Sequence, residues 1–136
     1  MKAPFALAHA SHADWSTTTE SCLAQLARQR RSGPAAQEDG LGFAYLSDAL
    51  RPHADRILAL LKSRSGIVDW VGCSSLGVCA TGSEYFDEPA LCVMVGRFPA
   101  GSFRVFSGTQ RPPEPGARTP SGAEAASAAL VHADPA

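Results

Sequence analysis

The feature that most constrains the fold is an alternation of short apolar runs with helix-like segments between residues 5 and 71. The apolar runs at residues 5–9, 41–46 and 67–71 have the length and composition of buried strands. A segment with helical spacing of apolar residues separates each run from the next, which is the pattern of strand–helix–strand units. Such units place successive strands parallel in one sheet through right-handed crossovers. The first three strands are therefore predicted to be parallel, with the helices packed on the sheet.

The first helix is predicted to begin at Thr17. Glu20 follows three residues later, and a threonine and a glutamate at this spacing form a capping box that satisfies the free N–H groups of the first turn. Leu23 and Leu26 continue an apolar face at helical spacing. The helix is predicted to end before a loop at residues 33–40, which begins with Gly-Pro.

The second helix is predicted with Pro52 in its first turn, where a proline removes no helical hydrogen bond. Ile57 and Leu61 then recur at helical spacing. Gly66 follows, and glycine is the residue best suited to a left-handed C-cap. The segment therefore has a start signal, an apolar face and a stop signal.

The sequence after the third strand predicts a turn and then an antiparallel pair. Residues 72–77, Gly-Cys-Ser-Ser-Leu-Gly, are predicted to form a turn at the end of that strand. Residues 91–95 and 103–106 are strand-like, and the Phe-Pro-Ala-Gly segment at 98–101 predicts that they form a hairpin. The predicted fold class is therefore α/β, with a mixed sheet that starts as a parallel βαβαβ unit and adds an antiparallel hairpin.

The chain length of 136 residues fits a single domain with a core of its own. Residues 1–106 are predicted to form one α/β module. Residues 107–122 are predicted to be a Pro/Gly-rich loop or insert, because they contain few apolar residues. Residues 123–136 have the pattern of a further helix and of a strand at 130–132. The sequence ends there, which indicates a truncated form of the module.

Charge and hydropathy argue against two classes of partner. Basic and acidic side chains number 12 and 13, so the formal net charge is −1, which does not favour nucleic-acid binding. No apolar run approaches the roughly 18 residues of a membrane-spanning helix, so no membrane partner is expected. The apolar stretch near the N-terminus is also too short for a secretory signal. Four cysteines fall in predicted helix and strands and are expected to be reduced thiols of a cytoplasmic protein.

Polar side chains gather where the three predicted parallel strands end. The carboxyl ends of parallel strands meet at one edge of a sheet, and open α/β sheets bind their ligands there. Small polar side chains at such an edge suit a small polar ligand. The candidate ligand-binding residues are Ser11, His12 and Asp14 after the first strand, Ser47 and Asp48 after the second, and Gly72, Cys73, Ser74 and Ser75 after the third.

Two features of this set suit a ligand that carries both charges. Backbone N–H groups in the turn around Cys73 and Ser74 would hold a carboxylate, as turn-borne N–H groups do. Asp14 or Asp48 would accept hydrogen bonds from an ammonium group. Ordinary turn and helix-cap roles are the alternative for each cluster, so the predicted site depends on all three clusters meeting.

Catalysis and metal binding have less support in the sequence. A Cys73 or Ser74 nucleophile with His12 or His132 would make a hydrolase, but the turn lacks the G-x-S-x-G pattern of a nucleophile elbow. Cys73 and Cys79 have neither the spacing nor the second ligand pair of a zinc site. A phosphate-binding loop and a dinucleotide fingerprint are also absent from the sequence. No cofactor is therefore expected.

Five stretches of the chain resemble the N-terminal part of FIST domains. They lie at residues 8–15 (AHASHADW), 41–48 (LGFAYLSD), 70–77 (WVGCSSLG), 84–91 (EYFDEPAL) and 132–135 (HADP). The resemblance implies an intracellular sensory module of bacterial and eukaryotic signalling proteins that binds small molecules such as amino acids. It also implies kinase, chemotaxis or cyclic-nucleotide output domains as partners and a chain that continues into a C-terminal FIST module. It supplies no catalytic residues.

The sequence therefore predicts a non-enzymatic, cytoplasmic sensory domain for a small polar ligand, truncated and without an output domain of its own. The expected partners are the small-molecule ligand and either a C-terminal FIST module or a signalling output protein. Two alternatives stay open. One is a cysteine or serine hydrolase, and the other is a protein–protein interaction module that pairs through an open edge strand.

Overall fold

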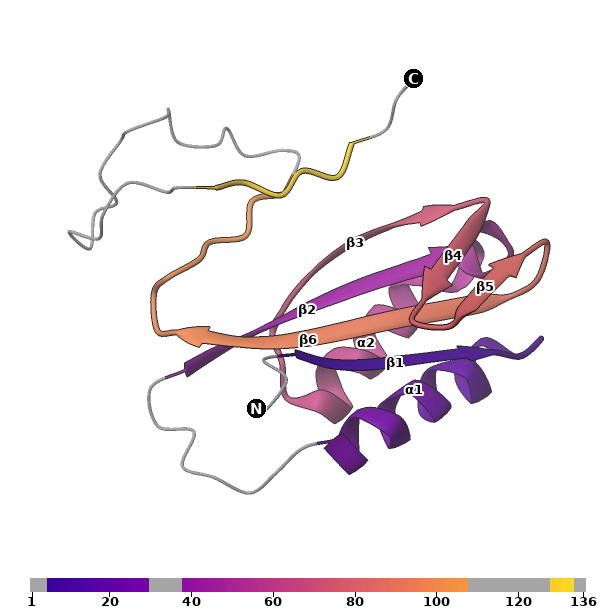
Figure 1. Cartoon of the computed structure of the whole chain (residues 1–136), viewed down its shortest axis with the longest axis horizontal. Coiled ribbons are helices and arrows are strands. Elements are labelled where there is room, and N and C mark those ends of the chain that lie inside the picture. The colour runs from indigo at the N-terminus through magenta and orange to yellow at the C-terminus, as the bar shows by residue number, and fades with distance from the viewer. Residues whose placement is uncertain (1–4, 30–37, 108–127, 134–136) are drawn as a thin grey trace.

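A four-stranded mixed sheet forms the centre of the computed structural model, which describes residues 5–29, 38–107 and 128–133 (Figure 1). Its strands are β1 (Phe5–Ser11), β2 (Glu38–Ser47), β3 (Asp69–Ser75) and β6 (Ala90–Pro99), in the order β1-β6-β2-β3. β2 and β3 pair in parallel, and β6 pairs antiparallel with β1 and with β2. β1, β2 and β3 therefore run in one direction, and the predicted α/β class with a mixed sheet is confirmed. β1 and β2 are not neighbours, however, because β6 lies between them.

Two helices pack on one face of this sheet. α1 (Trp15–Gln29) follows β1, and α2 (Ala54–Ser65) precedes β3. A 3-10 helix, η1 (Asp48–His53), joins β2 to α2, so the Pro52 predicted in the first turn of the second helix lies in η1 instead. Gly66 ends α2 as predicted, with a left-handed φ of 73° and an N–H that donates to the Lys62 carbonyl at 3.1 Å. Across the described ranges, no helix combines the length and the apolar character that a bilayer crossing requires.

The start of α1 differs from the prediction because its capping residue is Asp14. Asp14 Oδ2 accepts hydrogen bonds from the Thr17 backbone N–H at 2.7 Å and from Thr17 Oγ1 at 2.9 Å. Thr17 therefore lies inside the helix, and the predicted Thr17–Glu20 capping box is wrong. Glu20 instead forms an ion pair with Arg64 of α2, with Oε1 and Nη1 3.0 Å apart.

The antiparallel hairpin lies at a different place from the predicted one. β4 (Gly77–Ala80) and β5 (Ser83–Phe86) form a separate two-stranded sheet that the sequence analysis did not predict. The chain does turn after Pro99, whose carbonyl accepts from the Ser102 N–H at 3.0 Å, but residues 103–106 form no strand. Phe103 packs edge-on against Phe98 instead, with ring centroids 5.7 Å apart. This segment therefore contacts the end of β6 through side chains, and the predicted hairpin is wrong.

Other boundaries also differ from the predictions. Residues 72–75, predicted as part of a turn, belong to β3, which pairs with β2 as far as Ser75. β2 begins at Glu38, so residues 38–40 are strand and not loop. The predicted Pro/Gly-rich loop and helical stub lie almost wholly outside the described residues, and the strand predicted at 130–132 is not formed.

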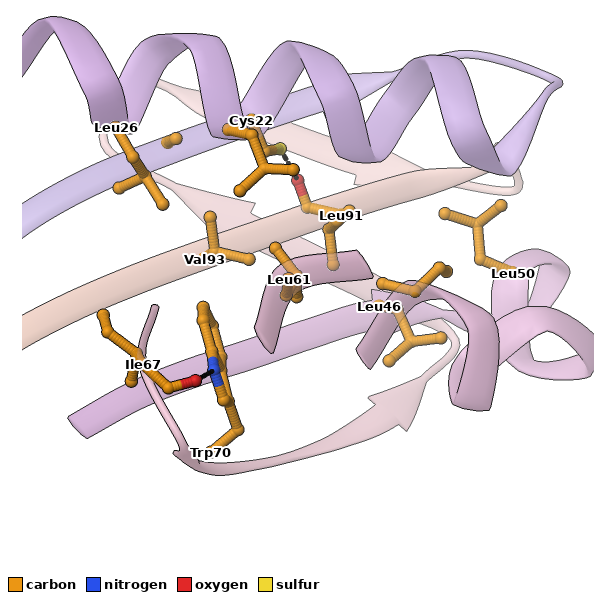
Figure 2. Close-up of a cluster of buried hydrophobic side chains, with 12 residues drawn as sticks. Cys22, Leu26, Leu46, Leu50, Leu61, Ile67, Trp70, Leu91 and Val93 are labelled. Carbon is orange, nitrogen blue, oxygen red and sulfur yellow. Dashed lines mark hydrogen bonds between the residues drawn. The ribbon is translucent and has the colours of Figure 1, made fainter. Parts of the chain in front are cut away.

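The hydrophobic core lies between the helices and the sheet (Figure 2). Leu61 of α2 and Leu91 and Val93 of β6 are completely buried there. Trp70 of β3 is almost completely buried as well, and its indole N–H donates to the Ile67 carbonyl at 2.9 Å. The largest aromatic side chain of the core is thereby packed with its polar group satisfied.

The opposite face of the sheet is partly covered by the β4–β5 hairpin. Val78 of β4 is buried, and the hydroxyl of Tyr85 of β5 lies 2.5 Å from Nδ1 of His9 on β1. On β2, the hydroxyl of Tyr45 lies 3.1 Å from Nε2 of His132. The hairpin and the described C-terminal residues therefore contact the sheet on the side away from the helices.

Candidate functional site

The three predicted clusters meet at one edge of the sheet, which we call the carboxyl edge because β1, β2 and β3 end there. Ser47 is the register partner of Ser75, and Ser11 is the register partner of Ala90 at the start of β6. Ser47 also contacts Ala90, because its Oγ accepts the Ala90 N–H at 2.9 Å. These contacts form a row across the ends of the four strands, in the order Ser11, Ala90, Ser47 and Ser75. β1, β2 and β3 end at the right of Figure 1. The sequence prediction that the strand ends converge is confirmed.

The serine hydroxyls of the carboxyl edge already have structural partners. Ser47 is 2% exposed and joins the end of β2 to the start of β6. Ser11 Oγ donates to Glu88 Oε2 at 2.5 Å, and Ser75 Oγ donates to the Gly77 carbonyl at 2.5 Å. These contacts stabilise the connections into and out of the β4–β5 hairpin. The ordinary turn role therefore describes these three serines.

His12 and Asp14 form the connection from β1 to α1. The Asp14 N–H donates to His12 Nδ1 at 3.0 Å, and the His12 carbonyl accepts from Thr18 Oγ1 at 3.0 Å. The backbone hydrogen bond from Thr17 is the main reason that the pKa of Asp14 lies below the ordinary carboxyl value of 3.8. The carboxylate of Asp14 is thus the cap of α1.

The backbone around Gly72, Cys73 and Ser74 does not form the predicted turn-borne nest of N–H groups. These residues are extended within β3 and lie in register with residues 44–46 of β2. A Cβ atom added at Gly72 would lie 1.7 Å from the Ala44 carbonyl oxygen. Glycine is therefore required at this position by the close approach of two strands and not by a ligand.

Asp48 is a predicted site residue whose side chain remains available. It is exposed at the start of η1 and lines an open hollow at the carboxyl edge together with Arg51 and Pro52. In the part of the chain that the structure describes, neither the Asp48 side chain nor the Arg51 side chain forms a hydrogen bond or an ion pair with another residue. Opposite charges therefore line one hollow without an ion pair between them.

Arg51 and Pro52 are absent from the sequence-based site. The signal that identifies them is an acidic and a basic residue three apart directly after a predicted strand, Asp48 and Arg51. In a 3-10 helix, side chains at this spacing lie above one another on the same side. The second helix was predicted with Pro52 in its first turn, and the 3-10 helix η1 before it was not predicted.

The geometry gives no support to the hydrolase alternative. Cys73 is exposed on β3 beside its register partner Tyr45, and His132 contacts that tyrosine. His12 lies in the β1–α1 connection, where its Nδ1 accepts a backbone N–H. Among the described residues, no histidine ring nitrogen is within hydrogen-bonding distance of the Cys73 thiol. Burial, followed by the neighbouring thiols of Cys73 and Cys92, raises the pKa of Tyr45.

Within the described ranges, histidine, cysteine, aspartate and glutamate side chains form no group of three or more that is placed to hold a metal ion. All four cysteines have free thiols, two of them buried (Cys22 and Cys92) and two exposed (Cys73 and Cys79).

Comparison with protein families identifies the chain. The FIST N domain family matches residues 40–136, which is more than half of the chain. The chain belongs to the FIST N domain family. FIST domains are sensory domains of signal transduction. The match covers β2 from Gly40 onward, η1 and every later element of this FIST N domain, including the hollow at Asp48 and Arg51.

Comparisons with curated proteins and with solved structures found no match. The family assignment therefore depends on residues 40–136. β1, α1 and the connection between them precede the matched region, and they carry Ser11, His12 and Asp14. The resemblance noted at residues 8–15 lies outside the match.

Proposed function

We propose that this FIST N domain is a cytoplasmic sensor that binds a small zwitterion, such as an amino acid, at the carboxyl edge. The observation that carries the proposal is that Asp48 and Arg51 line one hollow, and that neither side chain is paired with another described residue. A carboxylate accepts hydrogen bonds from an ammonium group, and a guanidinium donates two parallel hydrogen bonds to a carboxylate. The two side chains therefore complement both charges of an amino acid.

The state of the two side chains supports recognition of both charges together. Neither side chain has to break an ion pair or a hydrogen bond with another described residue before it binds. Both are exposed, and a single ion pair at an exposed position contributes little, about 0–1 kcal/mol. A ligand with one charge is therefore expected to bind much more weakly than a zwitterion of the same size.

The position of η1 supports a route from the ligand to the rest of the domain. η1 joins the end of β2 directly to the start of α2, and its Leu50 is 1% exposed in the core. Binding at Asp48 and Arg51 would restrain this junction. The domain is expected to respond through the position and the order of α2, which an output partner would detect.

The free thiols support a cytoplasmic location. Four reduced cysteines, two of them exposed, suit a compartment that keeps thiols reduced.

The interaction-module alternative predicts a mass that rises with protein concentration, because it depends on an edge strand that pairs with another copy or a partner.

Thermal denaturation of the full chain against a panel of free amino acids tests the proposal. A ligand at 100 times its dissociation constant adds about 2.7 kcal/mol to the free energy of unfolding. In a domain of this size, that raises the midpoint by roughly 5–15 °C. The shift is expected to disappear in Asp48→Asn and in Arg51→Gln. It is expected to persist in the control variants Asp55→Asn and Arg56→Gln, which change exposed residues of α2.

Two results would contradict the proposal. An equal shift in Asp48→Asn and Arg51→Gln would place the ligand elsewhere. A cooperative transition that no amino acid moves would exclude this ligand class, and a concentration-dependent mass in light scattering would then favour the interaction module.

A further inference from the structure

A second hollow lies between the two helices and the sheet, at the end opposite the carboxyl edge. Its volume is about 190 Å³. Leu23 and Leu26 of α1, Ile67 before β3 and Val95 of β6 line it, and the first three of these are at least 92% buried. Figure 2 labels Leu26 and Ile67 at the same end of the core cluster, with Leu26 on α1 and Ile67 in the segment before β3. The hollow is therefore walled mainly by aliphatic side chains.

One ion pair lies on the solvent side of this hollow. Arg64 of α2 and Glu20 of α1 both line it, and Arg64 Nη1 lies 3.0 Å from Glu20 Oε1. The Arg64 side chain is 59% exposed and the Glu20 side chain 43% exposed, so water reaches both charges. An ion pair that exposed is weak, and replacing one carboxylate by another costs little.

We propose that this hollow binds a short aliphatic carboxylate of about four to six carbons. The hydrocarbon chain of the ligand lies against the aliphatic walls of the hollow, formed by Leu23, Leu26, Ile67 and Val95. The carboxylate of the ligand takes the place of Glu20 at the Arg64 guanidinium. Guanidinium binds carboxylates through paired hydrogen bonds, and aliphatic walls exclude a polar chain. The hollow of about 190 Å³ is smaller than the 300–1,000 Å³ typical of drug-sized ligands, which limits the chain length.

This site is separate from the carboxyl edge. It lies at the end where β1, β2 and β3 begin, and none of the residues that line it lines the hollow at Asp48 and Arg51. It also selects a different chemistry, because its walls are aliphatic and the ligand needs no ammonium group. The inference does not depend on the proposed function.

Calorimetric titration of the full chain with sodium propanoate, butanoate, pentanoate and hexanoate tests the proposal. The affinity is expected to rise roughly fourfold with each added methylene, because each one buries a further apolar group. 1-Hexanol, which has the same chain without a carboxylate, is expected to bind at least roughly tenfold more weakly than hexanoate.

Variants of the ion pair make the test sharper, because they change affinity in opposite directions. Arg64→Gln is expected to weaken hexanoate binding at least roughly tenfold. Glu20→Gln removes the competing carboxylate and is expected to strengthen hexanoate binding roughly two- to fivefold. Arg56→Gln, on the same helix, and Asp48→Asn, at the carboxyl edge, are the controls and are expected to leave hexanoate binding unchanged.

Three results would overturn the proposal. Affinity that does not depend on chain length would mean that the aliphatic walls are not used. Weaker binding in Glu20→Gln would mean that the ligand does not replace this carboxylate. Equal affinities of the wild-type chain and Arg64→Gln would remove the guanidinium from the site.

Discussion

At the scale of single residues, the close approach of β3 to β2 explains why glycine is present at position 72, which was predicted to belong to a ligand site. Gly72 has a φ of 158° and lies in β3 opposite Ala44. A Cβ atom there would overlap the Ala44 carbonyl oxygen, which belongs to the main chain and cannot rotate away. The structural role of Gly72 is therefore sufficient to explain the residue.

Gly72→Ala is expected to lower the free energy of unfolding by about 3 kcal/mol, because β3 must move away from β2 to accommodate the methyl group. Gly82→Ala is the matched control. Gly82 also has a positive φ of 78°, but no atom lies within 4 Å of its added Cβ, so the cost is expected to be about 1 kcal/mol. Urea denaturation measures both values, and equal costs in the two variants would show that close approach at Gly72 is not the cause.

At the scale of elements, local signals predicted that helices and strands exist more accurately than where they begin. The C-cap at Gly66 was predicted correctly, because a glycine in a left-handed conformation acts within one turn. The start of α1 was wrong, because Asp14 and Thr17 are both good capping residues and the sequence does not show which one the chain uses. The β4–β5 hairpin was missed. Only Val78 of β4 is buried, so the apolar alternation that identifies a strand is weak there.

The cap of α1 predicts a pH dependence that belongs to this element. The pKa of Asp14 is lowered in the folded chain, chiefly by the Thr17 backbone hydrogen bond, so the native state binds this proton less tightly than the unfolded chain. The stability that Asp14 contributes is therefore fully present above pH 3.8 and is lost as the pH falls through its lower folded pKa. Asp14→Asn keeps an uncharged capping acceptor and is expected to be less sensitive to pH between 5 and about 2.

Urea midpoints of the wild-type chain and of Asp14→Asn, measured across that range, test this dependence. Asp14→Ala is expected to have a lower midpoint than Asp14→Asn at pH 7, together with lower helix content, because the first turn of α1 loses its acceptor. Identical pH profiles of the wild-type chain and Asp14→Asn would show that the charge of Asp14 does not contribute to the cap.

At the scale of the whole molecule, both faces of the sheet protect a cysteine. Cys22 of α1 is completely buried against β6, where its thiol donates to the Leu91 carbonyl with Sγ and O 3.6 Å apart, and burial raises its pKa to about 12. Cys92 lies on the opposite face at 5% exposure, and burial raises its pKa as well. Cys73 and Cys79 are exposed. Thiol reactivity therefore reports on the packing of both layers.

Alkylation of the native chain with iodoacetamide near pH 7.5 is expected to modify Cys73 and Cys79 and to leave Cys22 and Cys92 unmodified until the chain unfolds. The thiolate is the reactive form, and the two buried thiols are both inaccessible and hard to ionise. Mass spectrometry of peptides at increasing urea concentrations gives the order of labelling. Labelling of Cys92 well before Cys22 would show that the hairpin layer opens independently of the helices, whereas labelling of both in native buffer would contradict the described packing.

The same exposed thiols bear on the hydrolase alternative. Cys73 and Cys79 are expected to react at comparable rates, because no described histidine hydrogen-bonds to either one. A Cys73 that reacts far faster than Cys79 at neutral pH would revive a catalytic role for it.

The sequence by itself determined the α/β class, the common direction of the first three strands and the edge at which their polar ends meet. These features follow from apolar periodicity and from the handedness of strand–helix–strand units, which act over short stretches of chain. Only the tertiary structure decided that β6 lies between β1 and β2. It also decided that the side chains of Ser47, Ser11 and Asp14 have structural partners. The side chains of Asp48 and Arg51 have none among the described residues. The physical reason is that the strand order and the partners of Ser47 and Ser11 depend on hydrogen bonds between residues far apart in the chain. The cap of α1 is local, but two good capping residues compete for it, and the folded chain uses Asp14.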